Sequence, residues 1–380
     1  MSKIDIRELL VKTVEEGASD LHICAGIPPM IRVNGNVDPL EGYKRLTAEE
    51  TQELIYSVMN EEQIAEFETE KECDLSFGLE GFSRFRLNVY RDRGSVVGAF
   101  RAIPFSILSF EELGLPRVIA DFASRPAGLV LICGPTGCGK STTLAAIINK
   151  INNERKCHII TVEDPIEMVA PELNQMQVQP AIDLTFAQGI RTLLRQDPDI
   201  IMVGEIRDLE AAQMAVQAAL TGHLVLSTLH TNDAASAVTR LLALGVPYYL
   251  IQNVLIGVMA QRLVRTLCPH CKETGQIDGA LWEALIRPWP LPKPVTIRAP
   301  CGCPECRNTG YLGRIGLYEL LTVTPELRRL FRPNMDADEL RRRASARGMR
   351  PLRVSAALQI AAGLTTFEEV IQILPPLDED

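Results

Sequence analysis

The sequence predicts an α/β protein with a parallel sheet in its second part, and three observations support this prediction. Near-continuous apolar runs at residues 158–162, 200–203 and 223–229 are typical of strands buried on both faces of a parallel sheet. Stretches with helical apolar spacing separate these runs, which is the alternation of an α/β fold. A glycine-rich loop lies between a further apolar run, 128–133, and a helical stretch, 141–150, as in a strand–loop–helix unit.

The first part of the chain, residues 1–103, predicts a smaller α+β domain. Its expected elements are a helix at 6–16, strands within 21–37 broken by the hairpin signal Asn34-Gly35-Asn36, a helix at 47–67 opened by a capping box, and three strands within 73–103. In the second of these three strands, polar and apolar residues alternate, which places them on opposite faces. Two prolines bound a predicted linker at 104–116, so the α/β domain is expected at 117–380.

The glycine-rich loop, residues 134–141, reads Gly-Pro-Thr-Gly-Cys-Gly-Lys-Ser and matches the pattern G-x-x-x-x-G-K-[ST] of a phosphate-binding loop. Its glycines let the backbone curl until several N–H groups point into one concavity, and the following helix adds its positive dipole end. Lys140 would supply a positive charge to the outer phosphates, and the Ser141 hydroxyl is placed to bind Mg²⁺. The residues predicted to bind ATP are Gly134, Pro135, Thr136, Gly137, Cys138, Gly139, Lys140, Ser141 and Thr142.

Each of the three apolar runs ends in a polar cluster, which is where an open α/β sheet places its ligand site. Glu163 follows the first run, Glu205 the second and His230 the third. Hydrolysis of a nucleotide needs a metal clamp, an acid that orients or deprotonates water, and a sensor of the outer phosphate. We expect Glu205, with Ser141, to hold Mg²⁺, Glu163 to activate the water and His230 to sense the phosphate. The alternative is that all three are ordinary polar residues at strand ends.

Four cysteines form two CxxC pairs, Cys268 with Cys271 and Cys303 with Cys306, separated by 31 residues. Four thiolates close a tetrahedral zinc site without an open position, which predicts a structural zinc ion. Because the separation exceeds that of compact zinc modules, we expect a small subdomain at 267–312, followed by C-terminal helices at 320–380. A redox CxxC pair is the alternative. Two neighbouring residues, His270 and Cys301, are close enough in sequence to be rival ligands.

Composition excludes some classes of protein. The formal charge is −9, from 39 Lys and Arg against 48 Asp and Glu, and a globally acidic chain is a poor general nucleic-acid binder. The one basic cluster, 341–343 with Arg347 and Arg350, predicts a solvated helix face. No run approaches the roughly 18 apolar residues of a membrane helix, and the first residues do not form a signal peptide. We therefore expect a cytoplasmic protein whose membrane contact is peripheral.

The clusters after the apolar runs resemble, almost residue for residue, those of the secretion motor ATPases. That family includes the type II secretion ATPases and the assembly and retraction ATPases of type IV pili. The resemblance implies that Glu163 belongs to an aspartate box, Glu205 to a Walker B motif, and His223 and His230 to a histidine box. It also implies a PAS-like N-terminal domain, a RecA-like ATPase core, a homohexameric ring, and an inner-membrane platform protein as partner at the cytoplasmic face of that membrane.

The same resemblance implies that two arginines of the N-terminal domain complete a site between domains. Arg86 and Arg101 match that pair by spacing, and the planar fork of arginine suits charge spread over phosphate oxygens. Without the resemblance, both arginines would be interpreted as solvent-facing residues of a strand.

The chain combines features of two branches of the family. Residues 18–32 resemble the retraction ATPases, whereas 226–233, 313–320 and 363–369, with the two cysteine pairs, resemble the assembly and secretion ATPases. We favour a motor for pilus assembly or for extension of a type II secretion pseudopilus, with pilus retraction as the alternative. A nucleic-acid or DNA-transfer motor is less well supported because the chain is acidic. A zinc scaffold without ATPase activity is less well supported because the phosphate-binding loop is intact.

Overall fold

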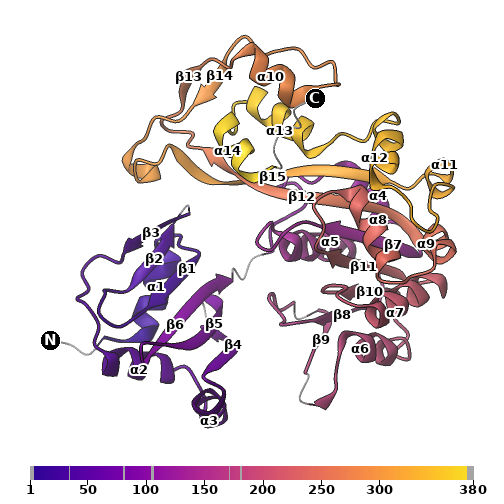
Figure 1. The fold of residues 1–380 in the computed structure, drawn as a ribbon. Coiled ribbons are helices and arrows are strands. Elements are labelled where there is room, and N and C mark those ends of the chain that lie inside the picture. Colours follow the sequence, from indigo (N-terminus) through magenta and orange to yellow (C-terminus); the bar gives the residue numbers. More distant parts are fainter. Residues whose placement is uncertain are drawn as a thin grey trace. The chain divides into compact units, whose positions relative to one another are not determined.

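A computed structural model describes residues 4–33, 35–79, 82–103, 107–170, 172–179 and 182–374. Contacts within the chain divide it into two compact units, residues 1–106 with 167–169, and residues 107–166 with 170–380. Each unit has its own sheet, and the elements of each follow one another along the chain as Figure 1 shows. The two units are described in turn.

The first unit is built on a six-stranded antiparallel sheet with the strand order β3-β2-β1-β6-β5-β4. Its elements are α1 (Ile6–Glu15), β1 (Asp20–Ile23), β2 (Met30–Val33), β3 (Asn36–Pro39), α2 (Ala48–Tyr56), α3 (Glu61–Glu70), β4 (Glu72–Leu79), β5 (Ser83–Asp92) and β6 (Ser95–Ile103). The alternation predicted for β5 is confirmed, because Phe85, Leu87 and Val89 are fully buried while Arg84 and Arg86 face the other side. One face of this sheet therefore builds a core, and the opposite face is polar.

The single helix predicted at 47–67 is wrong, because the structure has two helices there. The capping box at Thr47 is confirmed, since its side chain accepts from the N–H of Glu50 and the Glu50 side chain accepts in return. A second capping box, formed by Asn60 and Gln63, starts α3. Asn60 competes with helix continuation by bonding the backbone ahead of it, so the chain breaks between the two helices. Asn34 of the predicted hairpin lies outside the described residues.

The second unit contains a seven-stranded sheet with the order β15-β12-β7-β11-β10-β8-β9, parallel except for the β12–β15 pair. The predicted α/β class with a parallel sheet is confirmed. Its elements are α4 (Arg117–Ala123), β7 (Gly128–Cys133), α5 (Lys140–Glu154), β8 (Ile159–Glu163), β9 (Asn174–Gln177), α6 (Phe186–Leu193), β10 (Ile200–Val203), α7 (Leu209–Leu220), β11 (Leu224–Leu229), α8 (Ala234–Ala243), α9 (Tyr248–Val254), β12 (Leu255–Leu267), β13 (Glu273–Gly275), α10 (Gly279–Ile286), β14 (Ile297–Ala299), β15 (Tyr311–Thr322), α11 (Pro325–Arg328), α12 (Ala337–Ser345), α13 (Leu352–Ala361) and α14 (Phe367–Ile373).

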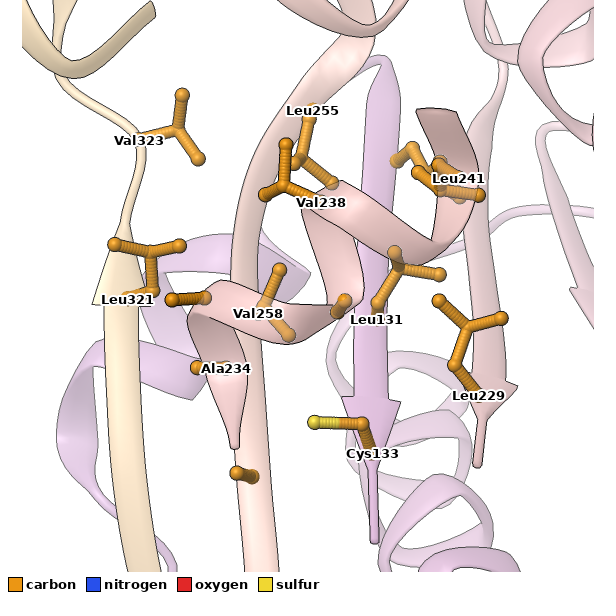
Figure 2. Packing of buried hydrophobic residues seen from close by; sticks show 14 of the residues in the cluster. Leu131, Cys133, Leu229, Ala234, Val238, Leu241, Leu255, Val258, Leu321 and Val323 are labelled. Atoms are coloured by element: carbon orange, nitrogen blue, oxygen red, sulfur yellow. The ribbon is translucent and has the colours of Figure 1, made fainter. Parts of the chain in front are cut away.

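Helices cover both faces of this sheet, and alternate residues of its central strands enter two different cores. Val130 and Ile132 of β7 pack in the core with α4 and α5, whereas Leu131 of the same strand packs in the core with α7, α8 and α9. Figure 2 shows α8 on the second face, with Val238 lying over the strands near Leu131 and Val258. Because helices cover both faces, a ligand is expected to bind at the ends of the strands.

Two further segments of the second unit matter for the site. Residues 107–116, part of the predicted linker, include Phe110 and Leu115, which are buried in the core with α4 and α5. The long strands β12 and β15 run from the sheet to the segment that holds β13, β14 and α10 (Figure 1). Within the described residues, no helix combines the length and the apolar character needed to cross a membrane.

Candidate nucleotide site and metal cluster

The phosphate-binding loop connects β7 to α5, as its pattern requires. Gly134 and Gly139 have φ angles of +151° and +87°, which residues with side chains rarely adopt. A Cβ on Gly134 would also lie 2.6 Å from a carbonyl oxygen of β12, so the loop needs glycine there for space as well. Among the described residues no side chain caps the first turn of α5. Its N–H groups are therefore available to an anion such as a phosphate.

Lys140, the first residue of α5, folds back over this loop. Its Nζ donates to the carbonyl oxygens of Gly134 (2.9 Å) and Pro135 (3.0 Å). Burial is the largest influence on the Lys140 pKa and lowers it, while the charge of Glu205 acts in the opposite direction. Lys140 and Glu205 therefore interact electrostatically.

The strand order brings the predicted acids and the histidine to one edge of the sheet. β7, β11, β10 and β8 are adjacent and parallel, so their carboxyl ends meet at the same edge. Glu163 ends β8, Glu205 lies two residues beyond β10, and His230 directly follows β11. A Cβ on Gly204 would lie 3.4 Å from the Cα of Glu163, which places the two strand ends in contact.

Glu205 is the centre of a polar cluster at this edge. Its Oε2 lies 3.2 Å from Nε2 of His230, and its other oxygen pairs with Arg207. Arg207 also lies 3.5 Å from a carboxylate oxygen of Asp164, the residue after β8. Hydrogen bonding to Glu205 is the main reason that the pKa of Arg207 is raised. Arg207 was not predicted as a site residue from the sequence, although its position two residues after Glu205 is a usable signal.

Glu163 is held from its own strand and from the next one. Its Oε1 accepts from Thr161 Oγ1 at 2.6 Å and from Gln175 Nε2, on β9, at 3.0 Å. Two donors to the same oxygen fix the orientation of the carboxylate. The arrangement suits a base that must accept a proton from a bound water.

The two histidines of the suggested histidine box do not lie together. His223 precedes β11 and contacts the carbonyl oxygen of Ala218 at 2.9 Å, whereas His230 follows β11. A strand of six residues spans roughly 20 Å at the usual rise per residue. Only His230 is therefore at the edge that carries Glu205.

Arg86 and Arg101 lie in the first unit, directly opposite each other on β5 and β6. Arg86 pairs with Asp74, and Arg101 Nε donates to Asp20 Oδ1 at 3.0 Å. The Arg101 side chain remains 64% exposed. Both guanidinium groups thus lie on the polar face of this sheet, and their approach to a nucleotide stays a prediction.

The four cysteines predicted to bind zinc are brought together. The sulfur atoms of Cys268, Cys271, Cys303 and Cys306 all lie within 4.8 Å of one another, and three of the pairs are 3.7–3.8 Å apart. Four sulfurs about 2.3 Å from a tetrahedral zinc ion are about 3.8 Å apart, so the spacing fits this metal. His270 and Cys301 are exposed, and the cluster found in the described part of the chain contains neither.

Backbone N–H groups donate to two of the four cysteine sulfurs. The N–H of Gly302 donates to Cys271 Sγ at 3.3 Å, and those of Cys303 and Gly310 donate to Cys306 Sγ at 3.2 Å. Burial raises the pKa of Cys306, but these two N–H groups, together with hydrogen bonds to the sulfurs of Cys303 and Cys271, lower it overall. Burial instead raises the pKa of Cys271 to about 12. Such outer hydrogen bonds orient sulfur ligands in metal sites. The segment between β12 and β15 contains β13, β14 and α10, and Trp282 of α10 is buried in the same core as Ile360 and Phe367 of the C-terminal helices.

Two buried residues of β12 that the sequence analysis missed also contact the phosphate-binding loop. Gln261 Nε2 donates to the carbonyl oxygen of Cys138 at 2.7 Å, and Arg262 lies against Gly134. Their signal in the sequence is a polar pair that directly follows the apolar residues 255–260 of β12.

Comparison with known proteins places the chain among its relatives. The family described as "Type II/IV secretion system protein" matches residues 3–372. A "Type II secretion system ATPase E" from Vibrio cholerae is 38% identical over 382 aligned positions, covering 97% of this chain and 74% of that relative. A "Type IV pilus assembly ATPase TfpB" from Acinetobacter baylyi is 48% identical over 273 residues, covering 71% of this chain and 46% of that relative.

A solved structure, "Crystal Structure of the Pilus Retraction Motor PilT and Bound ADP", matches with a TM-score of 0.76 and 35% identity, covering 99% of this chain and 98% of that one. The chain spans about half the length of curated relatives such as TfpB. These matches agree with the resemblance noted in the motifs. The chain belongs to the Type II/IV secretion system protein family.

Proposed function

We propose that the chain hydrolyses ATP and acts as a motor subunit of a type IV pilus or type II secretion machine. The observation that carries the proposal is the meeting of Lys140, Glu163, Glu205 and His230 at one edge of the parallel sheet. A phosphate loop, two acids and a histidine on adjacent strand ends are what phosphoryl transfer to water requires. The relatives named as ATPases support the same chemistry.

Each residue has a distinct part in the proposed reaction. The loop N–H groups and Lys140 bind the β- and γ-phosphates. Ser141 and Glu205 would hold Mg²⁺, which offsets phosphate charge when it is bound. Glu163, oriented by its two donors, accepts a proton from the attacking water. His230 contacts Glu205 and senses whether the outer phosphate is present.

We further propose that the second unit is the RecA-like core, the first unit a PAS-like domain, and the working assembly a homohexameric ring. Arg86 and Arg101 would then approach the phosphates, in their own subunit or in a neighbour, when the two units close on each other. An arginine that contacts the phosphates stabilises the transition state, and its release after hydrolysis provides movement. A platform protein at the cytoplasmic face of the inner membrane would receive that movement.

The four cysteines would bind one structural zinc ion. Four thiolates and their N–H donors leave no position for a substrate, so the proposed role is to stabilise the segment between β12 and β15. Cys268 directly follows β12, and the segment returns through β15 to the sheet. The zinc would therefore stabilise the strand pair at the edge of the nucleotide-binding sheet.

Within the family, we favour pilus assembly or pseudopilus extension, because two curated relatives with 48% identity are named "Type IV pilus assembly ATPase TfpB" and "Type II secretion system protein HxcR". Pilus retraction is the second candidate, and one observation favours it: the retraction motor PilT matches over nearly the full length of both chains. Expression in one host strain lacking its assembly motor and another lacking its retraction motor distinguishes them. Restored pilus formation in the first strain supports assembly, and restored retraction in the second supports the alternative.

The experiment that tests ATPase activity uses the purified chain with ATP and Mg²⁺, with and without DNA. We expect the chain to release phosphate from ATP without nucleic acid. We also expect no salt-sensitive binding of DNA, that is, no affinity that falls steeply between low and moderate salt. A DNA motor would require DNA for turnover and would show that salt dependence. A chain that binds zinc but releases no phosphate under any condition would instead be the non-catalytic scaffold.

A further inference from the structure

Two consecutive polar residues of β12, Gln261 and Arg262, are buried where this strand passes the phosphate-binding loop. Both are buried, with exposed fractions of 2% and 4%. Neighbouring residues of a strand point to opposite faces of the sheet, so Gln261 faces α5 while Arg262 faces the loop before α8. Because a buried polar group is costly unless it is hydrogen-bonded, the partners of these side chains indicate what they do.

Gln261 joins the phosphate-binding loop to the helix that follows it. Its Nε2 donates to the carbonyl oxygen of Cys138 at 2.7 Å, and its Oε1 accepts from Thr143 Oγ1 at 2.8 Å. The approach is close at both ends of the loop: a Cβ on Gly134 would lie 2.6 Å from the Gln261 carbonyl oxygen, and one on Gly139 would lie 2.9 Å from its Nε2. One side chain thus fixes both the curvature of the loop and the start of α5.

Arg262 joins the same loop to the segment that carries His230. Its terminal nitrogens donate to the carbonyl oxygen of Gln261 at 2.9 Å, and to the main-chain oxygen and Oδ1 of Asn232 at 2.9 and 3.3 Å. A Cβ on Gly134 would lie 3.3 Å from this guanidinium. Within the described residues no carboxylate pairs with Arg262, so neutral oxygen atoms alone satisfy its buried charge.

These contacts form a continuous path across the site. Asn232, held by Arg262, lies two residues after His230, and His230 lies 3.2 Å from Glu205. The N–H of Gly134 also donates to the carbonyl oxygen of Leu229, at 3.3 Å. The phosphate-binding loop and the Glu205–His230 pair are therefore connected through adjacent residues of β12. An apolar pair would fill the same space without the desolvation cost of a buried cation, which suggests a role beyond packing.

We propose that Gln261 and Arg262 are positioning residues with separate tasks: Gln261 sets the phosphate-binding loop for nucleotide binding, and Arg262 holds His230 against Glu205 for turnover. The inference rests on the proposed ATP site and assigns residues to it that do not touch the nucleotide. If the pair were only structural, substitutions would lower stability and leave the binding and turnover of the folded protein unchanged.

The test measures ATP affinity, turnover and Tm for Gln261→Leu, Gln261→Glu and Arg262→Lys in the full chain. Gln261→Glu keeps the acceptor for Thr143 but loses the donor to the loop. For both Gln261 variants we expect the Kd for ATP to rise about 10-fold, the effect of one or two lost buried hydrogen bonds. Arg262→Lys keeps the positive charge, but a lysine ammonium group cannot donate to the oxygens of Gln261 and of Asn232 at the same time. We expect ATP binding within about 3-fold of wild type and turnover reduced about 10- to 100-fold, as misplaced groups cause.

Two matched control variants distinguish an effect on the geometry of the ATP site from a general loss of protein stability. Gln252 is another amide that bridges backbone groups, donating to the carbonyl oxygens of Arg328 and Phe331, and Arg265 on β12 pairs with Glu369. Gln252→Leu and Arg265→Lys should lower Tm while leaving ATP affinity and turnover unchanged. A double variant supplies the sharpest readout: if Arg262 acts through His230, adding Arg262→Lys to His230→Ala should reduce turnover no further.

Wild-type affinity in folded Gln261→Glu, or wild-type turnover in folded Arg262→Lys, would overturn the corresponding half of the proposal. Fully additive effects of Arg262→Lys and His230→Ala would show that Arg262 does not act through His230. If Gln261→Leu does not fold, Gln261→Glu decides the first half, because it changes a single atom of the side chain. Failure of the wild-type chain to bind ATP would contradict the proposed ATP site instead, so the two failures are distinguishable.

Discussion

The Nε2 atom of His230 lies 3.2 Å from Oε2 of Glu205, where β11 and β10 end side by side. The other Glu205 oxygen pairs with Arg207, which lies 3.5 Å from Asp164 at the end of β8. One carboxylate, 15% exposed, thus connects the ends of three neighbouring strands. A substitution or movement of His230 should therefore change the position of Glu205, the acid that we expect to hold Mg²⁺.

The first prediction concerns this contact. His230→Ala should bind ATP within about 3-fold of wild type, because the phosphate-binding loop is untouched. Turnover should fall by about 10- to 100-fold, since Glu205 loses the partner that orients one of its oxygens. Equilibrium nucleotide binding and phosphate release, measured on the same preparation, check both statements. His158→Ala, at the opposite end of β8, is the control and should retain wild-type turnover.

The second prediction concerns the arginines of the first unit. Arg86→Ala and Arg101→Ala should each fold and bind nucleotide. The Arg86–Asp74 pair is exposed, and such pairs contribute only about 0–1 kcal/mol to stability. Asp20, the buried partner of Arg101, keeps its hydrogen bond from Ser19 and its ion pair with Arg32. Turnover should fall about 10³-fold or more if they act as arginine fingers. Steady-state phosphate release tests this, with Arg45→Ala as a control that removes an exposed positive charge elsewhere in the same unit.

Mixing variants shows whether these arginines act across subunits. If they do, combining Arg101→Ala chains with Glu163→Gln chains should restore part of the activity. Some interfaces of the mixed assembly then contain an intact Glu163 from one chain and an intact Arg101 from its neighbour. Turnover close to wild type in both single arginine variants would mean that these residues form an ordinary solvated surface, and the mechanism between units would be wrong.

The third prediction concerns metal. Protein purified without added metal should contain one zinc ion per chain, measured by elemental analysis. Cys303→Ser should lose this zinc and lower Tm by about 5 °C or more, because metal-binding free energy adds to folding free energy. Cys301→Ser, which alters an exposed cysteine outside the cluster, should keep both the zinc and the Tm. Near-zero zinc together with four freely titrating thiols would refute a zinc site.

The sequence predicts those parts of the site whose chemistry is local in the chain. The phosphate-binding loop is one continuous stretch, and Glu163, Glu205 and His230 each follow directly on an apolar run, so strand ends in a parallel sheet bring them together. The spacing within each CxxC pair likewise predicts that both of its cysteines can bind one metal ion, and the four sulfurs do lie together. The break between α2 and α3 was missed because a local cap at Asn60 overrides helical periodicity.

Contacts that depend on strand order could not be predicted in this way. Gln261 and Thr143 are 118 positions apart in the sequence, and they meet only because β12 pairs with β7 in the sheet. Arg207 reaches Asp164 for the same reason, since β10 lies beside β8. No periodicity or motif in a single sequence fixes which strands are neighbours, so the residues that position the site become visible only in the folded chain.

The measurement that tests the account most directly compares ATP binding and hydrolysis for wild type, Glu163→Gln and Lys140→Ala, with Mg²⁺ and without nucleic acid. Glu163→Gln removes the proton acceptor and leaves the phosphate-binding loop unchanged. We predict that it binds ATP as wild type does and releases almost no phosphate, while Lys140→Ala no longer binds ATP tightly. Hydrolysis at the wild-type rate by Glu163→Gln would contradict the account, because the carboxylate at the end of β8 would then not be the base.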